Sequence, residues 1–114
     1  MGLAFKEVEI NGKKYKALID TGFYGEVLVS KKVAEELNLK PIEEKERITV
    51  DGRKVKVKVA IAKVKIDNDE SYMFVEILDE LPLDVLIGVY ALERLGYYVD
   101  PKTGTIKKIG LLAV

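Results

Sequence analysis

The chain has 114 residues, and its 19 acidic residues balance its 19 basic residues, so the formal net charge is zero. No overall charge therefore directs it to nucleic acid or to an anionic membrane. Cysteine and histidine are both absent, which removes thiol nucleophiles, Ser-His-Asp triads, disulfides and most zinc sites. Hydrolytic chemistry in such a chain must use carboxylates, lysine or a hydroxyl that they activate, and we expect no metal and no cofactor.

Length and hydropathy narrow the class further. The length predicts a single domain over residues 1–114. The sequence opens with no basic segment followed by a long apolar one, and no run approaches the roughly 18 apolar residues of a membrane span. We therefore expect a soluble, cytoplasmic protein. Tryptophan and glutamine are missing while lysine and glutamate are plentiful, a balance typical of thermophilic sources.

The N-terminal third predicts a β-hairpin, a short strand and a short helix. Asn11-Gly12 is the strongest two-residue hairpin signal, and it separates strands expected over 3–10 and 14–19. A short buried strand is expected over 27–29. Ser30 then predicts a cap for a helix over 31–37.

The middle of the chain predicts a second hairpin. Strands over 47–50 and 53–66 flank Asp51-Gly52, a turn of the type that needs positive φ angles. In the longer arm the apolar positions are odd-numbered at first and even-numbered later. This change predicts a bulge or a sheet crossing near residues 60–63.

Residues 71–78 predict another strand, with apolar side chains on both faces. Tyr72 and Phe74 lie on one side, and Met73, Val75 and Ile77 on the other. Burial on both sides predicts a central position in the sheet.

The last third begins with an apolar strand that ends at Gly88. A helix is expected over 89–95 with a stop at Gly96, and a hairpin over 97–109 follows. The tail, residues 111–114, is wholly apolar and needs cover from its own core or from a second chain.

The stretch 17–22 delivers a carboxylate, Asp20, directly from an apolar strand into Thr21 and Gly22. Such a carboxylate is partly buried, and the hydroxyl and the glycine turn can hold it by hydrogen bonds, as in a catalytic site. Asp and Gly are also common turn formers, so the tripeptide alone favours a simple turn after a strand.

Two stretches together carry a resemblance. The segment 17–22 followed by Val27-Leu28, and the later Leu86-Ile87-Gly88 followed by a helix, resemble the retropepsin-like aspartic proteases, the single-domain relatives of retroviral protease. The Asp-Thr-Gly-Phe form, with Phe23 and Gly25, is most similar to a prokaryotic and archaeal group. The resemblance covers residues 3–110 and includes a central hairpin where the family has its flap.

The resemblance implies a fold and a site. The fold would be all-β, a closed acid-protease barrel of six to nine short strands with one short C-terminal helix near 89–95, and a shorter helix after Ser30. Asp20 would be the catalytic aspartate, Thr21 the hydroxyl that braces the loop against a partner copy, and Gly22 the residue at which the backbone turns. The segment 86–88 would pack behind the loop. The residues implied in substrate binding are Phe23, Tyr24, Gly25, Asp51, Gly52, Ile87 and Gly88.

Two departures from the retroviral pattern stand out. Retroviral members have acidic residues shortly after Asp-Thr-Gly and an arginine after the later glycine, which form an ion pair. Here Tyr24 and Gly25 occupy the first place and Val89 the second. The joint loss predicts an apolar replacement for this pair. The flap turn also lacks a glycine-rich tip, since only Gly52 is present.

One Asp-Thr-Gly supplies half of a two-carboxylate site, so the expected enzyme is an aspartic endopeptidase active as a homodimer on peptide or protein substrates. The first alternative is a catalytically silent binding module that holds an extended peptide on the same β fold. A more distant one is a dyad within one chain, formed by Asp20 with Asp84 or Asp100.

Overall fold

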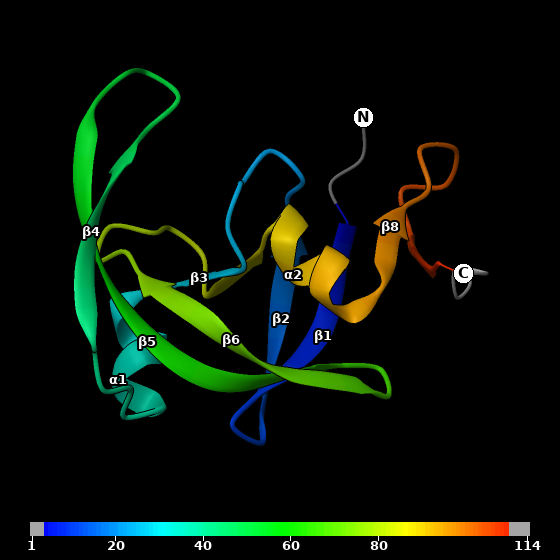
Figure 1. Ribbon diagram of the computed structural model, residues 1–114, viewed down its shortest axis with the longest axis horizontal. Coiled ribbons are helices and arrows are strands. Elements are labelled where there is room, and N and C mark those ends of the chain that lie inside the picture. The colour runs from blue at the N-terminus through cyan, green and yellow to red at the C-terminus, as the bar shows by residue number, and fades with distance from the viewer. Residues whose placement is uncertain (1–3, 110–114) are drawn as a thin grey trace, which may run out of the picture.

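The computed structural model describes residues 4–109, which form nine strands and two helices (Figure 1). In chain order these are β1 (Ala4–Ile10), β2 (Lys13–Ile19), β3 (Val27–Val29), α1 (Lys31–Glu36), β4 (Glu43–Ile48), β5 (Lys54–Ile66), β6 (Asp69–Ile77), β7 (Val85–Ile87), α2 (Val89–Leu95), β8 (Tyr97–Val99) and β9 (Ile106–Lys108). None of these helices is long and apolar enough to cross a membrane.

Six of the strands close into a barrel. Hydrogen-bonded neighbours follow the order β1-β2-β7-β3-β6-β5-β4, and β1 also pairs with β5 at Glu9↔Lys65 and Ile10↔Val64. Closure leaves the six strands without a free edge. Within the described residues β4 pairs only with β5, so these two strands project from the ring as a hairpin (Figure 1). The prediction of a mainly β, closed barrel is confirmed.

Leucines on neighbouring strands hold the short strand β7 in place. β7 has three residues, all buried, and it runs parallel to β2 and antiparallel to β3. Leu86 lies opposite both Leu18 and Leu28, and the three side chains form a cluster against which Phe23 packs. Cross-strand contacts of this kind stabilise a sheet. They fix the carboxyl end of β2 beside that of β7.

The long strand β5 changes the face that it buries. Its pairing with β6 is continuous from Lys58↔Ile77 to Ile66↔Asp69, so no bulge interrupts this ladder. The strand instead passes from pairing with β4 to pairing with β1, which is the predicted sheet crossing. The buried side chains are at odd-numbered positions before residue 60 and at even-numbered positions from there on. They are Val57, Val59, Ala60, Ala62, Val64 and Ile66.

The two predicted hairpin turns have different geometries. Asn11 and Gly12 have φ angles of 49° and 85°, as a two-residue turn of type I′ requires. In the second turn Gly52 has a φ of 86°, and the Thr49 N–H donates to the Arg53 carbonyl at 2.8 Å. This is a three-residue loop with a left-handed glycine, so the prediction of a two-residue turn is wrong. β4 therefore ends at Ile48, before the turn.

Strand β6 is central, but its second face is buried only at Glu76. It lies between β3 and β5, as predicted. Met73, Val75 and Ile77 are buried, whereas Tyr72 and Phe74 are exposed, so the prediction of burial on both faces is wrong. Aromatic residues favour strands on exposed faces as well as in cores, which makes composition ambiguous here.

Both short helices begin and end where the sequence predicts. The Ser30 hydroxyl accepts a hydrogen bond from the Val33 N–H at 3.3 Å and caps α1. Asn38 follows α1 with a φ of 51°, and Gly96 ends α2 with a φ of 80°.

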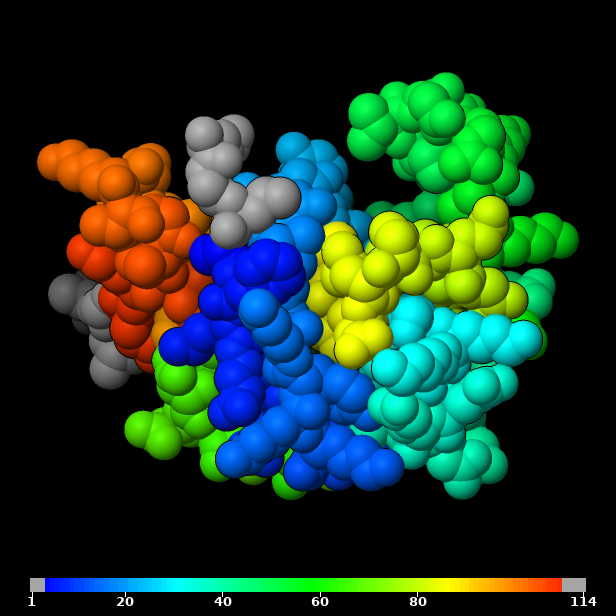
Figure 2. Space-filling model, turned by 180° about the vertical axis from the view of Figure 1, so that it is seen from behind, coloured from blue at the N-terminus to red at the C-terminus, as the bar shows by residue number. Residues whose placement is uncertain are grey.

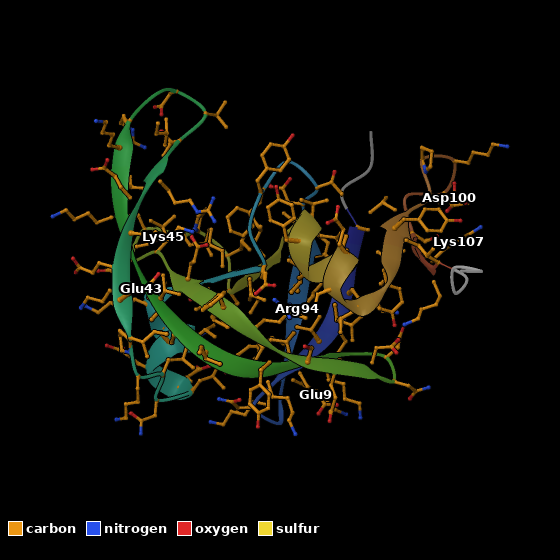
Figure 3. All side chains as sticks on the ribbon, viewed as in Figure 1. Glu9, Glu43, Lys45, Arg94, Asp100 and Lys107 are labelled. Carbon is orange, nitrogen blue, oxygen red and sulfur yellow. The ribbon has the colours of Figure 1, made fainter. Side chains whose placement is uncertain are left out.

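The hairpin of β8 and β9 is fastened to the start of β6. The Tyr97 hydroxyl lies 2.5 Å from the Asp69 carboxylate, and Lys108 pairs with the same carboxylate at 3.0 Å. At the other end of the hairpin Lys107 pairs with Asp100 at 2.8 Å (Figure 3). The apolar tail over 111–114, for which the sequence predicts cover, lies outside the described residues.

Candidate active site

The carboxyl end of β2 carries Asp20 to the rim of the barrel. Ile19 pairs with Ile87 of β7, and the Asp20 N–H donates to the Ile87 carbonyl at 2.9 Å. The chain then leaves the sheet as a loop, residues 20–26, which rises at the same side of the molecule as the tip of the β4–β5 hairpin (Figure 1). The backbone of Asp20 is therefore fixed by the sheet, while its side chain belongs to the loop.

The loop closes on the Asp20 carboxylate. The Gly22 N–H donates to Asp20 Oδ1 at 2.9 Å, and the Phe23 N–H donates to the Asp20 carbonyl at 3.1 Å. A Cβ at position 22 would lie 3.2 Å from Asp20 Oδ1, so a glycine leaves this carboxylate its room. Asp20 is half-buried and Thr21 is exposed. The tripeptide therefore forms a turn and also holds the Asp20 carboxylate by a hydrogen bond. The two interpretations of this sequence, a simple turn and a site for a carboxylate, are compatible.

Gly88 allows the next segment to pass directly behind the loop. A Cβ on Gly88 would lie 2.3 Å from the Gly25 carbonyl oxygen and 2.7 Å from that of Phe23. The first two N–H groups of α2 bind the same two oxygens: Val89 donates to Phe23 at 3.0 Å and Tyr90 to Gly25 at 3.1 Å. These helix donors have no partner within α2, so the loop satisfies them.

Asp20, Thr21 and Gly22 border a cavity of about 950 Å³. Its other walls come from Ala4, Ile19 and the turn between β8 and β9, residues 99–104. Asp20 therefore borders a large space between the loop and the β8–β9 turn. The β4–β5 hairpin contributes no residue to this cavity. Figure 2 shows a different hollow on the other side of the loop, between the loop and the hairpin.

The structure does not bring every predicted site residue to the carboxylate. Ile87 and Gly88 are buried and lie behind the loop, so a contact of these two residues with substrate stays a prediction. Asp51 and Gly52 lie at the tip of the hairpin, and the Asp51 carboxylate bonds its neighbours Thr49 and Arg53. Tyr24 is exposed and lies beside Tyr90, with ring centroids 6.3 Å apart.

Arg47, the last but one residue of β4, is a site residue that sequence reasoning missed. Its guanidinium binds the buried Glu76 carboxylate on β6 and also reaches the loop after Asp20. The hydrogen bonds that Arg47 donates to the Glu76 carboxylate raise the pKa of Arg47 above its usual range, so the cation is permanent. One signal was available: Glu76 is the single charged residue in the run 72–78, and a lone acid in an apolar strand indicates a buried ion pair.

The predicted apolar replacement of the retroviral ion pair is only half right. Tyr24 and Tyr90 do form an aromatic contact near the expected place. An ion pair nevertheless links the loop to the helix further along, since Arg94 binds Glu26 at 2.6 Å. The other Glu26 oxygen accepts the Phe74 N–H at 2.8 Å.

Neither candidate for a second carboxylate in the same chain is placed to act with Asp20: Asp84 is distant, and Asp100 is paired with a lysine. Asp84 precedes β7 and Asp20 follows β2, and these two strands run parallel. The two aspartates therefore lie at opposite ends of the strand pair, about four residues or roughly 13 Å apart along the strands. Asp100 borders the cavity, but it pairs with Lys107 and accepts the Lys102 N–H at 2.9 Å. The hydrogen bond from Lys107 lowers the pKa of Asp100, which keeps it ionised in a pair of its own.

A closed six-stranded barrel, an Asp-Thr-Gly loop braced by a second strand that ends in glycine, and a projecting hairpin together define a retropepsin-like aspartic protease. Residues 6–94 match the family described as gag-polyprotein putative aspartyl protease. The match covers most of the chain, which belongs to this family of aspartic proteases. A comparison with curated proteins finds no match.

Proposed function

We propose that the chain is an aspartic endopeptidase that works as a homodimer, with Asp20 of each copy in one shared site. The observation that carries this proposal is the Asp20 carboxylate, which is held by the Gly22 N–H and borders a cavity of about 950 Å³. Within residues 4–109, the other carboxylate that borders this cavity, Asp100, is paired with Lys107 and is not free to act with Asp20. A symmetric pair of chains supplies the second one, and twofold dimers are the commonest oligomers.

The pair would act by sharing one proton. Two carboxylates at roughly 3 Å cannot both be ionised, so one stays protonated. The ionised member takes a proton from water, which attacks the peptide carbonyl carbon, and the protonated member donates to the carbonyl oxygen. The Gly22 N–H holds Asp20 Oδ1 in place during these transfers.

Thr21 has the position that a brace between two copies needs. It is exposed, and its hydroxyl has no hydrogen-bond partner within residues 4–109. In a dimer this hydroxyl would bind the loop of the partner. The substrate would lie extended between the loop and the β4–β5 hairpin, with Tyr24 beside it and the tip at Asp51 and Gly52 over it.

The first test is the mass of the native particle together with binding of a pepstatin-type inhibitor. We expect a dimer at micromolar concentration and inhibitor binding by the dimer, because the inhibitor needs both carboxylates. A monomer that binds peptides without cleaving them would instead identify the binding module. A monomer that still cleaves peptides would place the second carboxylate within the chain.

The pH dependence of peptide cleavage gives a further prediction. The active pair holds a single proton, so activity falls at high pH, where both carboxylates lose their protons, and at low pH, where both gain one. We expect kcat/KM to follow a bell with its maximum on the acidic side of neutral, measured from about pH 3 to about pH 8. Circular dichroism at each pH separates titration from unfolding. An activity that is flat across this range would contradict a shared proton.

A further inference from the structure

Arg47 joins three parts of the site with one side chain. Its Nε and Nη2 atoms donate to Glu76 Oε1 and Oε2 at 2.7 and 2.5 Å, which makes a two-point contact between β4 and β6. Its Nη1 atom donates to the Tyr24 carbonyl at 3.1 Å. The β4 arm of the hairpin, the barrel wall and the loop after Asp20 therefore meet at one guanidinium.

The loop is packed against the same group. The guanidinium carbon lies 4.9 Å from the centre of the Phe23 ring, a cation–π contact. A Cβ on Gly25 would lie 2.7 Å from Arg47 Nη2 and 2.4 Å from Phe23 Cζ, so a side chain at this position would displace the guanidinium or the ring. Phe23, Gly25 and Arg47 thus form one packed unit.

The anchor on the barrel side is firm because Glu76 cannot turn to solvent. Its side chain is 3% exposed, and Lys45 also approaches it at 3.6 Å. Figure 3 places Lys45 on β4 beside the β5 and β6 strands. A buried carboxylate with two cations keeps its position, so Arg47 has a fixed base from which to reach the loop.

We propose that Arg47 is a positioning residue, which holds the loop segment 23–25 in register with the β4 arm of the flap and thereby fixes the loop that carries Asp20. The expected effect of Arg47 on peptide cleavage rests on the proposed function. The expected effect of Arg47 on the structure of the loop does not. The requirement is for a fork of donors: lysine can neutralise Glu76, but as a point charge it cannot also bind the Tyr24 carbonyl and stack on Phe23.

The structural test is amide hydrogen exchange in Arg47→Lys and Arg47→Met. The reporters are the Val89 and Tyr90 N–H groups, which donate to the Phe23 and Gly25 carbonyls and lie far from Arg47 in sequence. We expect them to exchange about ten-fold faster in Arg47→Lys than in the unaltered protein. The Asn11 N–H, which donates to the Lys63 carbonyl at 2.9 Å at the other end of the barrel, should be unchanged.

The matched control is Arg53→Lys, which changes the other arginine of the hairpin. Arg53 pairs with the exposed Asp51 and does not bind the loop, so both reporters should keep their exchange rates. Unchanged reporters in Arg47→Lys would overturn the proposal, because charge alone would then suffice. A uniform acceleration that includes Asn11 would also overturn it, since that is the result for a residue of general stability. Should Arg47→Met fail to fold, Arg47→Lys decides the question.

Kinetics separate this proposal from the protease assignment. If the unaltered protein cleaves peptides, Arg47→Lys should lower kcat/KM about ten-fold while its melting temperature stays close to that of the unaltered protein. Equal losses of activity and folded fraction would overturn the positioning role. If the unaltered protein cleaves no peptide, the protease assignment fails, and the exchange of Val89 and Tyr90 still decides whether Arg47 positions the loop.

Discussion

Asp20→Asn should abolish peptide cleavage and leave the barrel intact. Asparagine keeps the size of the side chain, and its Oδ1 can still accept the Gly22 N–H that lies 2.9 Å from Asp20 Oδ1. It cannot take a proton from water, so we expect kcat to fall by roughly 10³- to 10⁴-fold, the upper part of what a general base contributes. Cleavage of an unfolded protein substrate, followed by mass spectrometry, measures the loss.

The same variant should assemble at least as well as the unaltered protein. In the proposed dimer two partly buried acids must share a proton, and two amides remove that constraint, so dimer stability should be equal or greater. Sedimentation and thermal unfolding check this. Asp84→Asn, at the far end of the strand pair, is the matched control and should keep full activity, because the ion pair of Asp84 within residues 4–109 is with Lys32, at 3.9 Å.

Asp100→Asn distinguishes the dimer from a site within one chain. Asp100 borders the same cavity as Asp20 but is held by Lys107. If Asp100→Asn costs as much activity as Asp20→Asn, the second carboxylate is Asp100. Cleavage that persists in Asp20→Asn would remove Asp20 from the mechanism.

Local signals predicted the features that few residues determine. The turn at Asn11-Gly12, the Ser30 cap and the Gly96 stop each depend on φ angles or hydrogen bonds within about four residues. The Asp-Thr-Gly loop belongs to this group, since its main contacts join Asp20 to Gly22 and Phe23. The sequence alone was therefore sufficient to locate the candidate catalytic residue.

Strand β4 shows where pattern reasoning failed. Its first four residues, Glu43 to Glu46, are all charged and exposed, so neither face carries an apolar signal. The strand exists because its backbone pairs with β5 over six residues, from Glu43↔Val59 to Ile48↔Lys54. An edge strand of a projecting hairpin needs only these hydrogen bonds, and charged side chains protect it from pairing with other chains.

The ion pairs around the loop could not be predicted because their partners are distant in sequence. Arg47 and Glu76 are 29 residues apart, and Glu26 and Arg94 are 68 apart. Both pairs are attached to β6, the first through Glu76 and the second through the Phe74 N–H, which donates to Glu26. Comparison with the retroviral pattern predicted no such pairs, because that comparison considers only the positions where retroviral proteases carry their ion pair. Here the charged residues lie at other positions, on other strands and helices.

Gly88→Ala is expected to disable the site by steric conflict alone. Gly88 has φ −92° and ψ 174°, an extended conformation that alanine adopts without strain. Its new Cβ would lie 2.3 Å from the Gly25 oxygen, 2.5 Å from Phe23 Cδ2 and 2.7 Å from the Phe23 oxygen. Two of these atoms are backbone oxygens that already accept hydrogen bonds from α2, so the loop must move as a whole.

Overpacking of this kind costs about 1–3 kcal/mol of folding free energy, and we expect Gly88→Ala to lie at the upper end of that range. The matched control is Gly12→Ala, where a Cβ meets nothing within 4 Å but the φ is +85°. That control loses about 1–2 kcal/mol through backbone strain and should keep its activity, because the Asn11-Gly12 turn lies at the other end of β2 from Asp20.

The two alanine variants therefore separate stability from geometry. At a temperature where both proteins are more than about 95% folded, which a 2 kcal/mol margin ensures, Gly12→Ala should cleave peptides at the unaltered rate. Gly88→Ala should be slower by about a hundred-fold, because a displacement near 1 Å at Asp20 misaligns the shared proton. Thermal unfolding fixes the folded fraction and kcat is measured on the same samples. Equal activities in the two variants would show that the contact between Gly88 and the loop supports only the fold.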